Sequence, residues 1–488
     1  MRLSRYMMSV LFLMMFSSVM RADDTCKLSP RESVQLSINK FVNTPALKNA
    51  SVGVCVTRLD DMALLGEYCP LQSQITASTM KTVTSATALK LLGKDYRFHT
   101  TVTTDGAINN GHLDGNIIIT GSGDPTLGSE HMCDSIDFVK QVVSALKAHG
   151  IKEINGKIIV DDSAYPAPYV SGDWMVEDLG YGYGASVHAL NFCDNTLRLN
   201  YEIDKDNLNF NTIEGQTYLK LMNHGTIINE DDDSTQITGP EFRLDINDDM
   251  LHLFGTMKPQ KGIRTIANPS PDLLLRDSVT TALKDAGIAI LNKDFQLCHK
   301  AEPTLLLDFE SPALTDIVNS LLVRSDNMYT ESVLRAIAID SCKTGTTLNG
   351  VEVVKNFWRE HGVDVEGLFM IDGSGLARTN KAPASFFNHM LSLAYRDLSV
   401  DGIKFHELFP IAGKNGTVRK LTAKTSASGK FALKSGSMSH VQCYVGYYPV
   451  ESPKYVVSIL INSFTCPRSE LVKMVSEMLV GIDNALSE

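Results

Sequence analysis

The sequence predicts an α+β fold, in which helices pack on an antiparallel sheet and a large β-rich insertion divides the domain. Three observations indicate this class. The chain begins with a helix-like segment and a hairpin-like segment, and it ends with three strand-like segments followed by an amphipathic helix. Between roughly residues 98 and 290 it changes to short strand-like runs separated by Gly, Asn and Asp turns. One domain split by an insertion explains this order better than independent domains in series.

The length and composition are those of a globular protein of two or three domains. The chain has 488 residues, of which 43% are hydrophobic and 21% are charged. Its formal net charge of −11 argues against a nucleic-acid partner, because phosphate binding requires a basic face. No Cys-x-x-Cys motif or Cys/His cluster indicates a metal site, so we expect no metal.

The first 22 residues are typical of a secretory signal peptide. Arg2 and Arg5 precede the apolar run 7–20, and Ala22 stands at its exit before a polar segment. The run is short for a membrane span, and a retained anchor is the alternative. We therefore expect a signal peptide at 1–22 and an exported protein that is periplasmic or secreted.

The divided domain begins with a helix and a hairpin. Residues 29–43 have helical spacing, and residues 50–69 alternate as two strands that turn near 59–62. An exported chain permits disulfides, and Cys55 and Cys69 flank this turn, so they could face each other across the strands. The connectivity of the nine cysteines cannot be read from the sequence.

The second half of the domain follows the insertion. Residues 311–339 again have a helical pattern, and the pattern of residues 429–464 predicts three consecutive strands. The predicted division is a discontinuous main domain at 23–95 and 291–488 and an insertion at 96–290, which we expect to form two small subdomains. A closing amphipathic helix is predicted from apolar residues at helical spacing, namely Leu471, Met474, Val475, Met478 and Leu479.

The segment ASTMKTVTSATAL (77–89) contains a Ser-x-x-Lys motif. Lys81 is its only charged side chain and stands three residues after Ser78, so both lie on one helix face. A neutral lysine amine can take the proton of a serine hydroxyl, and an apolar helix lowers the lysine pKa by desolvation. The motif also occurs at Ser37–Lys40 and Ser144–Lys147, in polar surroundings typical of surface helices. The motif alone therefore does not assign catalysis.

A Ser-x-Asn motif enters an apolar helix at 325–327. The hydroxyl of Ser325 can relay a proton, and the amide of Asn327 can hold a substrate carbonyl. The alternative is a helix cap, which Ser, Asp and Asn all favour. A second match at 37–39 lies within a predicted helix, so we reject it.

Two Lys-[Ser/Thr]-Gly matches compete for the third element, which belongs on a strand beside the site. The literal KTG at Lys343–Gly345 lies in polar sequence at a junction between helices. The KSG at Lys434–Gly436 lies in the first of the three consecutive strands. The second match fits the chemistry and the first does not.

These three motifs, in this order and spacing, resemble those of a known family. The chain is similar to the class C low-molecular-mass penicillin-binding proteins, the D-alanyl-D-alanine carboxypeptidase/endopeptidase family. The likeness covers nearly all of the chain after the signal and includes GSGDPTL (121–127), DGSGLAR (372–378) and GTVRKL (416–421). The first and second of these could be structural turns. The family usually has Thr where Ser435 stands, and the hydroxyl is retained.

The resemblance implies a penicillin-binding, serine transpeptidase-like fold and a serine D,D-peptidase that acts on peptidoglycan stem peptides. It implies that Ser78 attacks the substrate carbonyl with Lys81 as base, that Ser325 relays the proton to the leaving amine, and that Asn327 orients the substrate amide. β-Lactam antibiotics are then covalent inhibitors, and no cofactor is required. A homodimer is left open.

The same resemblance implies how the substrate is held. Lys434 and Ser435 bind its carboxylate, and Gly436 lets the strand backbone approach closely. The backbone N–H groups of Ser78 and Ser437 form the oxyanion hole.

A weaker likeness concerns the insertion and the choice of substrate. Residues 172–186 resemble a region that binds the free amino end of a stem peptide, which makes Asp178 a candidate for that contact and Met438 a candidate wall of its pocket. A surface aspartate in a loop is the alternative.

Two other functions have to be weighed. A serine β-lactamase or esterase on the same core is disfavoured by the long insertion, and a non-catalytic penicillin-binding receptor or scaffold is disfavoured because all three motifs persist. The choice between carboxypeptidase and endopeptidase activity stays open.

Overall fold

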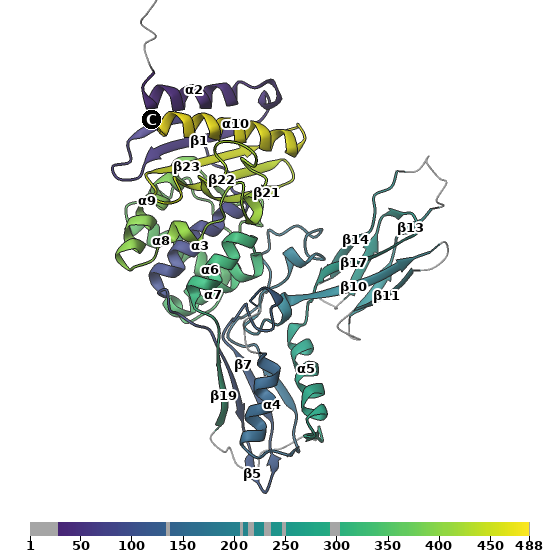
Figure 1. Cartoon of the computed structure of the whole chain (residues 1–488). Coiled ribbons are helices and arrows are strands. Elements are labelled where there is room, and N and C mark those ends of the chain that lie inside the picture. Colours follow the sequence, from purple (N-terminus) through teal and green to yellow (C-terminus); the bar gives the residue numbers. More distant parts are fainter. Residues whose placement is uncertain are drawn as a thin grey trace, which may run out of the picture.

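The computed structural model describes residues 28–132, 137–204, 208–212, 219–228, 236–245, 250–292 and 303–487. The predicted signal peptide lies outside these residues. Figure 1 shows a layered domain of one sheet and many helices, with the insertion extending from its helical side. Within the described ranges, no helix is long and apolar enough to cross a membrane.

A five-stranded antiparallel sheet forms the centre of the main domain. Its order, β2-β1-β23-β22-β21, joins the N-terminal hairpin to the C-terminal strands and leaves β21 at one edge. The predicted hairpin and the three predicted consecutive strands are confirmed. The strands are β1 (Ser51–Arg58), β2 (Leu64–Tyr68), β21 (Ala432–Met438), β22 (Val441–Tyr448) and β23 (Tyr455–Asn462).

Helices cover both faces of this sheet (Figure 1). The side chains of β1 alternate between the faces: Val54 and Val56 join the apolar cluster of α2 and α10, and Cys55 joins that of the other helices. One face carries α2 (Pro30–Val42) and α10 (Arg468–Leu486). The other carries α3 (Lys81–Leu91), α6 (Leu314–Arg324), α7 (Asn327–Cys342), α8 (Thr347–Glu360) and α9 (Ala384–Val400).

The first helix, α2, lies where the sequence predicts it, and a capping box at its N-terminus fixes where it begins. Ser29 Oγ accepts a hydrogen bond from the backbone N–H of Glu32, and the Glu32 carboxylate accepts one from the backbone N–H of Ser29. Pro30 occupies the first position, where its missing N–H costs nothing.

The pairing suggested for Cys55 and Cys69 is wrong. The register of β1 with β2 places Cys55 opposite Glu67, and Cys69 follows β2 with a φ of 41°. Cys55 is buried and Cys69 is exposed, so the two sulfur atoms do not meet and both thiols are free.

The first part of the insertion combines two four-stranded sheets with α4 (Phe138–Ala148) and α5 (Pro271–Asp285). The sequence predicted its strands but not these two helices, of which α4 packs on β19 and α5 on β9. One sheet is β19 (Thr304–Glu310), β4 (His99–Thr104), β7 (Ile117–Gly121) and β9 (Ile158–Asp161). The other is β18 (Ala289–Ile290), β8 (Glu153–Ile154), β6 (His112–Asp114) and β5 (Ala107–Asn109).

The second part of the insertion, in its described residues between 196 and 267, is built from strands and projects separately in Figure 1. Its sheets are β11 (Leu208–Thr212), β10 (Thr196–Ile203) and β17 (Gln260–Ala267); β12 (Lys220–Asn223), β15 (Met250–Phe254) and β14 (Glu241–Asp245); and the pair β13 (Thr226–Ile227) and β16 (Thr256–Met257). A further pair in the main domain joins β3 (Gln74–Ile75) to β20 (Lys381–Ala382).

The predicted domain boundary at 290 stays a prediction. Strand β19 lies beyond that boundary, yet it pairs with β4 of the insertion along its whole length. The two connections between the main domain and the insertion therefore run side by side as antiparallel strands.

Candidate active site

The Ser-x-x-Lys motif lies where a 3-10 turn, Ala77–Met80, runs into α3. Ser78 is half-buried in this turn. Lys81 Nζ lies 3.0 Å from Ser78 Oγ. It also lies 2.5 Å from Asn327 Oδ1 and 2.6 Å from the carbonyl oxygen of Ser374, and it donates to both. Serine and lysine are therefore in direct contact, one helical turn apart.

The surroundings of α3 explain why its residues 82–89 carry no charge. The helix contacts α6, α7, α8 and α9, and every side chain from 81 to 89 is buried. Burial lowers the pKa of Lys81 to about 8, against the opposing effects of Asp372, Glu331 and Asp326. A substantial fraction of this amine is thus neutral near physiological pH.

The Ser-x-Asn motif occupies the junction of α6 and α7. Ser325 ends α6 in the left-handed conformation, with φ 66° and ψ 41°, and Asp326 caps α7 by accepting a hydrogen bond from the backbone N–H of Tyr329. Asn327 begins α7 and contacts Lys81. Capping and site formation are combined here, because the central residue caps the helix while its two neighbours reach the site.

Lys434 reaches the same site from β21. It is fully buried, and its Nζ donates to Ser325 Oγ at 2.8 Å and to the carbonyl oxygen of Ser435 at 2.7 Å. The pKa of Lys434 is held well below its usual value, mainly because the side chain is buried and to a smaller extent because Lys81 is nearby. Ser435 Oγ donates to Thr417 Oγ1 at 2.6 Å.

Two glycines let the backbone close around the turn that carries Ser78. A Cβ atom at Gly436 of β21 would lie 2.5 Å from the carbonyl oxygen of Thr76 and 2.9 Å from the backbone nitrogen of Ser78. On the other side, a Cβ atom at Gly375 would lie 2.0 Å from the carbonyl oxygen of Ala77. Any other residue at either position would push its segment away from the turn.

The rejected motif matches lie elsewhere. Lys343 ends α7 in the left-handed conformation at the junction with α8, is exposed, and donates from Nζ to the carbonyl oxygen of Asp340. Lys40 on α2 and Lys147 on α4 are exposed as well. The preference for the strand-borne KSG and for the buried Ser-x-x-Lys agrees with these positions.

The loop 372–380 completes the site, and sequence reasoning gave it no chemical role. The Asp372 carboxylate accepts hydrogen bonds from the backbone N–H groups of Gly375 and Ala377 and from the side chains of Asn380 and Trp174. These bonds fold the loop so that a carbonyl oxygen meets Lys81. The DGSGLAR motif could have drawn attention to this loop. A sequence motif, however, does not show that a backbone carbonyl is the atom that contacts Lys81.

Glu331 of α7 is a second buried carboxyl that the sequence did not single out. It accepts a hydrogen bond from the backbone N–H of Ser374 at 2.7 Å. Burial, and then the charge of Asp372, raise the pKa of Glu331 to about 7. The lysine base therefore has a neighbour whose own charge changes near neutral pH.

A cavity of about 290 Å³ opens over Ser78. Asp178 and Tyr183 of the insertion line it together with Ser437 and Met438 of β21. Asp178 Oδ1 accepts a hydrogen bond from the Tyr183 hydroxyl at 2.9 Å. The structure thus brings the two residues of the weaker likeness, Asp178 and Met438, into the cavity that holds the serine.

Asn327 is engaged at both ends of its amide. Its Oδ1 accepts from Lys81, and its Nδ2 donates to the carbonyl oxygen of Tyr183 at 2.7 Å. The amide nitrogen has a second hydrogen, which can be donated to a substrate carbonyl while the bond to Tyr183 is kept. The insertion therefore contacts one of the predicted substrate-binding residues directly.

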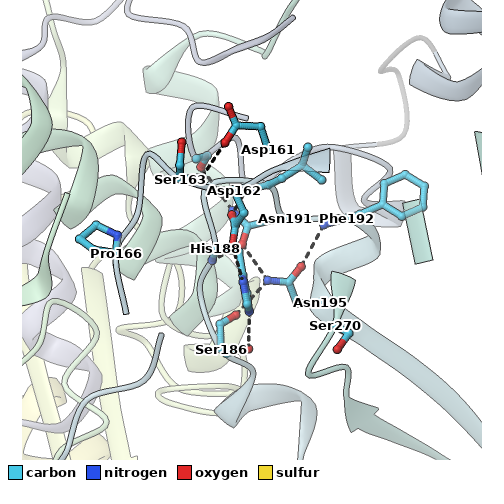
Figure 2. A network of polar contacts seen from close by, with 12 residues as sticks. Asp161, Asp162, Ser163, Pro166, Ser186, His188, Asn191, Phe192, Asn195 and Ser270 are labelled. Carbon is cyan, nitrogen blue, oxygen red and sulfur yellow. Dashed lines mark hydrogen bonds and ion pairs between the residues drawn. The ribbon is translucent and has the colours of Figure 1, made fainter. Parts of the chain in front are cut away.

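Figure 2 shows the polar network that holds this part of the insertion. His188 Nδ1 lies 2.9 Å from Asp162 Oδ2, and its Nε2 lies 3.0 Å from Ser186 Oγ. These contacts have the connectivity of a Ser–His–Asp triad. The imidazole is buried beneath the stacked ring of Tyr169, so we interpret the network as a clamp on the loop that carries Tyr183.

In this site a serine contacts a buried lysine, and a second serine–lysine pair lies beside them. This arrangement is typical of serine hydrolases that form an acyl-enzyme. The chain belongs to the D-Ala-D-Ala carboxypeptidase 3 (S13) family, whose model matches residues 34–480. It is therefore a serine D,D-peptidase, which confirms the resemblance seen in the sequence.

Individual relatives agree with this assignment. The chain is 26% identical over 402 residues to a D-alanyl-D-alanine carboxypeptidase DacB of Haemophilus influenzae, covering 79% of this chain and 81% of the relative. It is 24% identical over 455 residues to a D-alanyl-D-alanine carboxypeptidase of Actinomadura sp., covering 88% and 81%. The crystal structure of penicillin binding protein 4 (dacB) from H. influenzae superposes with a TM-score of 0.78 at 21% identity, over 92% of this chain and 99% of that one. This likeness confirms the predicted α+β penicillin-binding fold with additional domains.

Proposed function

We propose that this enzyme hydrolyses D-Ala–D-Xaa peptide bonds of peptidoglycan stem peptides, with Ser78 as nucleophile and Lys81 as its base. One observation carries the proposal. The two hydrogens of a neutral Lys81 amine have two acceptors, Asn327 Oδ1 and the Ser374 carbonyl oxygen, and the remaining neighbour at 3.0 Å is Ser78 Oγ. The nitrogen lone pair is thereby directed at the serine hydroxyl.

Acylation then proceeds in two steps. Ser78 Oγ attacks the carbonyl carbon of the D-Ala residue while its proton passes to Lys81 Nζ. The C–N bond breaks as the leaving amine receives a proton through Ser325, whose hydroxyl is held by Lys434 at 2.8 Å. An ester on Ser78 remains, and water hydrolyses it to regenerate the serine and release the acyl product. The backbone N–H groups of Ser78 and Ser437 stabilise the oxyanion, which is worth about 3 kcal/mol of barrier per donor.

The substrate is held at both sides of the scissile bond. Lys434 and the hydroxyls of Ser435 and Thr417 lie together and provide donors for the carboxylate beside that bond. Asp178 lines the cavity that contains Ser78. We assign it to the acyl side of the substrate, where it would offer a negative charge to the free amino end of a stem peptide. A β-lactam carries the equivalent carboxylate and carbonyl, so it acylates Ser78 in the same way.

The enzyme also requires access to peptidoglycan, and we propose that it is exported. The support is the signal-like segment 1–22. Cell fractionation, together with the intact mass of the mature protein, tests this proposal: a mass that retains residues 1–22 contradicts it.

Penicillin labelling combined with muropeptide digestion tests the enzymatic proposal. Wild-type protein and Ser78→Ala are incubated with fluorescent penicillin, and separately with cross-linked and uncross-linked muropeptides. We expect wild type to be labelled and to release D-amino-acid-terminated products, and Ser78→Ala to do neither. A covalent adduct on the variant contradicts the assignment of the nucleophile. Labelling of wild type without muropeptide turnover supports a receptor instead, and rapid β-lactam turnover supports a β-lactamase.

A further inference from the structure

A second, larger groove adjoins the catalytic cavity. Its volume is about 730 Å³, and the two cavities share Ser437 in their linings. Gln442 and Tyr444 of β22 line it, one wall is the segment 417–425, and the other is the N-terminal part of α10. A groove of this size accommodates a peptide-sized ligand. Apart from Ser437 and Thr417, its lining residues have no role in the chemistry described above.

Four basic side chains line this groove. Arg419 and Lys420 come from one wall, and Arg468 and Lys473 come from α10. All four are exposed, and within the described part of the chain none of them forms an ion pair with a carboxylate. Glu477 is the acidic residue among the described lining residues. A protein with a net charge of −11 thus presents a concentrated positive surface beside its active site.

The groove begins where the leaving group of the reaction is held. Thr417 Oγ1 accepts the hydrogen bond from Ser435 Oγ, and Thr417 also lines the groove. The carboxylate beside the scissile bond is expected at Lys434 and Ser435. Any chain that continues from the leaving residue therefore starts at the entrance of the groove, whereas a single leaving D-Ala ends there.

We propose that this groove binds the leaving peptide of a cross-linked substrate through its additional carboxylates, so that the enzyme favours cross-link cleavage over removal of a terminal D-Ala. The proposal rests on the D,D-peptidase function proposed above. A leaving strand of peptidoglycan carries acidic groups on its glutamyl residue and at its C-terminus. The four basic side chains, which form no ion pair within the described residues, complement these groups. Asp178 lies in the other cavity, so the charges of the two cavities match a substrate with an amine on the acyl side and carboxylates on the leaving side.

A pair of matched variants tests the groove. Arg419→Gln/Lys420→Gln removes two charges from it, and Lys48→Gln/Lys414→Gln removes two exposed charges that do not line it. For each protein, kcat/KM is measured on a purified cross-linked muropeptide dimer and on an uncross-linked pentapeptide monomer. The quantity compared is the ratio of the two values.

We expect the dimer-to-monomer ratio to fall about tenfold in the groove variant, the size expected of two partly exposed charge pairs, and to stay at the wild-type value in the control. Raising the salt concentration should lower the wild-type ratio towards that of the groove variant. An unchanged ratio in the groove variant, or an equal fall in the control, overturns the groove proposal. If wild type cleaves neither substrate, the proposed D,D-peptidase function itself fails.

Discussion

Two fully buried lysines, Lys81 and Lys434, lie close enough for one to lower the pKa of the other. Keeping both charged in a buried site is costly, because each ammonium loses its hydration and repels the other. Lys81 has Asp372 and Glu331 nearby, and both raise its pKa. The site is therefore arranged so that at least one amine is neutral, and the contact with Ser78 makes Lys81 the one that acts as base.

The pH dependence of acylation should follow Lys81. Its pKa of about 8 implies that the second-order rate constant for penicillin acylation rises with pH through that region, because only the neutral amine accepts the serine proton. Glu331→Gln removes a negative charge that favours the ammonium form, so the midpoint should move to lower pH.

Stopped-flow acylation between pH 5 and pH 10 measures this midpoint. Asp340→Asn serves as the control, because Asp340 is exposed at the far end of the same helix. A midpoint that moves to higher pH in Glu331→Gln, or that does not move, contradicts the assigned role of Lys81.

Among the secondary-structure elements, the contact between β21 and the turn at Ala77–Met80 sets the geometry of the reaction. Gly436→Ala inserts a methyl group 2.5 Å from the carbonyl oxygen of Thr76 and 2.9 Å from the Ser78 nitrogen. We expect it to lower the free energy of unfolding by about 1–3 kcal/mol and to slow acylation by at least tenfold, because the strand must move away.

Thermal unfolding and acylation kinetics check this prediction, with Gly172→Ala as the control. A Cβ atom at Gly172 meets no other atom within 4 Å. Wild-type acylation by a folded Gly436→Ala protein would show that this close approach is not required.

The two Lys-[Ser/Thr]-Gly matches differ in the element that carries them. Lys343→Asn should leave penicillin acylation within about twofold of wild type, because Lys343 is exposed at a helix end and Asn tolerates its left-handed backbone. Lys434→Gln should slow acylation by about a hundredfold or more, since it removes the amine that donates a hydrogen bond to Ser325. Gel-based labelling with fluorescent penicillin compares the two, and a strong loss in Lys343→Asn alone would mean that the motifs were assigned in the wrong order.

At the scale of the whole molecule, the insertion is part of the active site. Asn191 is buried where the insertion meets α7: its Nδ2 donates to Ser332 Oγ at 3.2 Å, and its Oδ1 accepts from the backbone N–H of His188 and from Asn195. Asn191→Ala should lower the free energy of unfolding by about 2–3 kcal/mol, because several buried polar groups lose their partner.

Chemical denaturation measures that loss, and Asn200→Ala, which truncates an exposed side chain on β10, is the control. Limited proteolysis should also cut the Asn191→Ala protein faster within 165–195, because the clamp in Figure 2 is weakened. Equal stability of the two variants would show that the network does not hold the insertion in place.

The sequence was sufficient to predict the architecture where periodicity and order are strong. The hairpin, the three consecutive strands, the closing helix and the five residues Ser78, Lys81, Ser325, Asn327 and Lys434 were all identified from patterns and spacing, and the structure brings those five together. The D,D-peptidase class was implied by the resemblance of these motifs to those of a known family.

Features that depend on three-dimensional contact were not predictable in this way. The carbonyl oxygen of Ser374 carries no side-chain signal, and the disulfide suggested by Cys55 and Cys69 depended on a register that proved different. The basic groove joins residues about fifty positions apart, such as Arg419 and Lys473, which no local motif connects.

The acylated residue is the most direct test of the central claim. Wild-type protein is incubated with benzylpenicillin, digested, and analysed by tandem mass spectrometry to locate the penicilloyl group. The account predicts a single adduct on Ser78. The rate at which this adduct forms should rise with pH through about pH 8. An adduct on Ser325 or on any other side chain, with Ser78 unmodified, would contradict it.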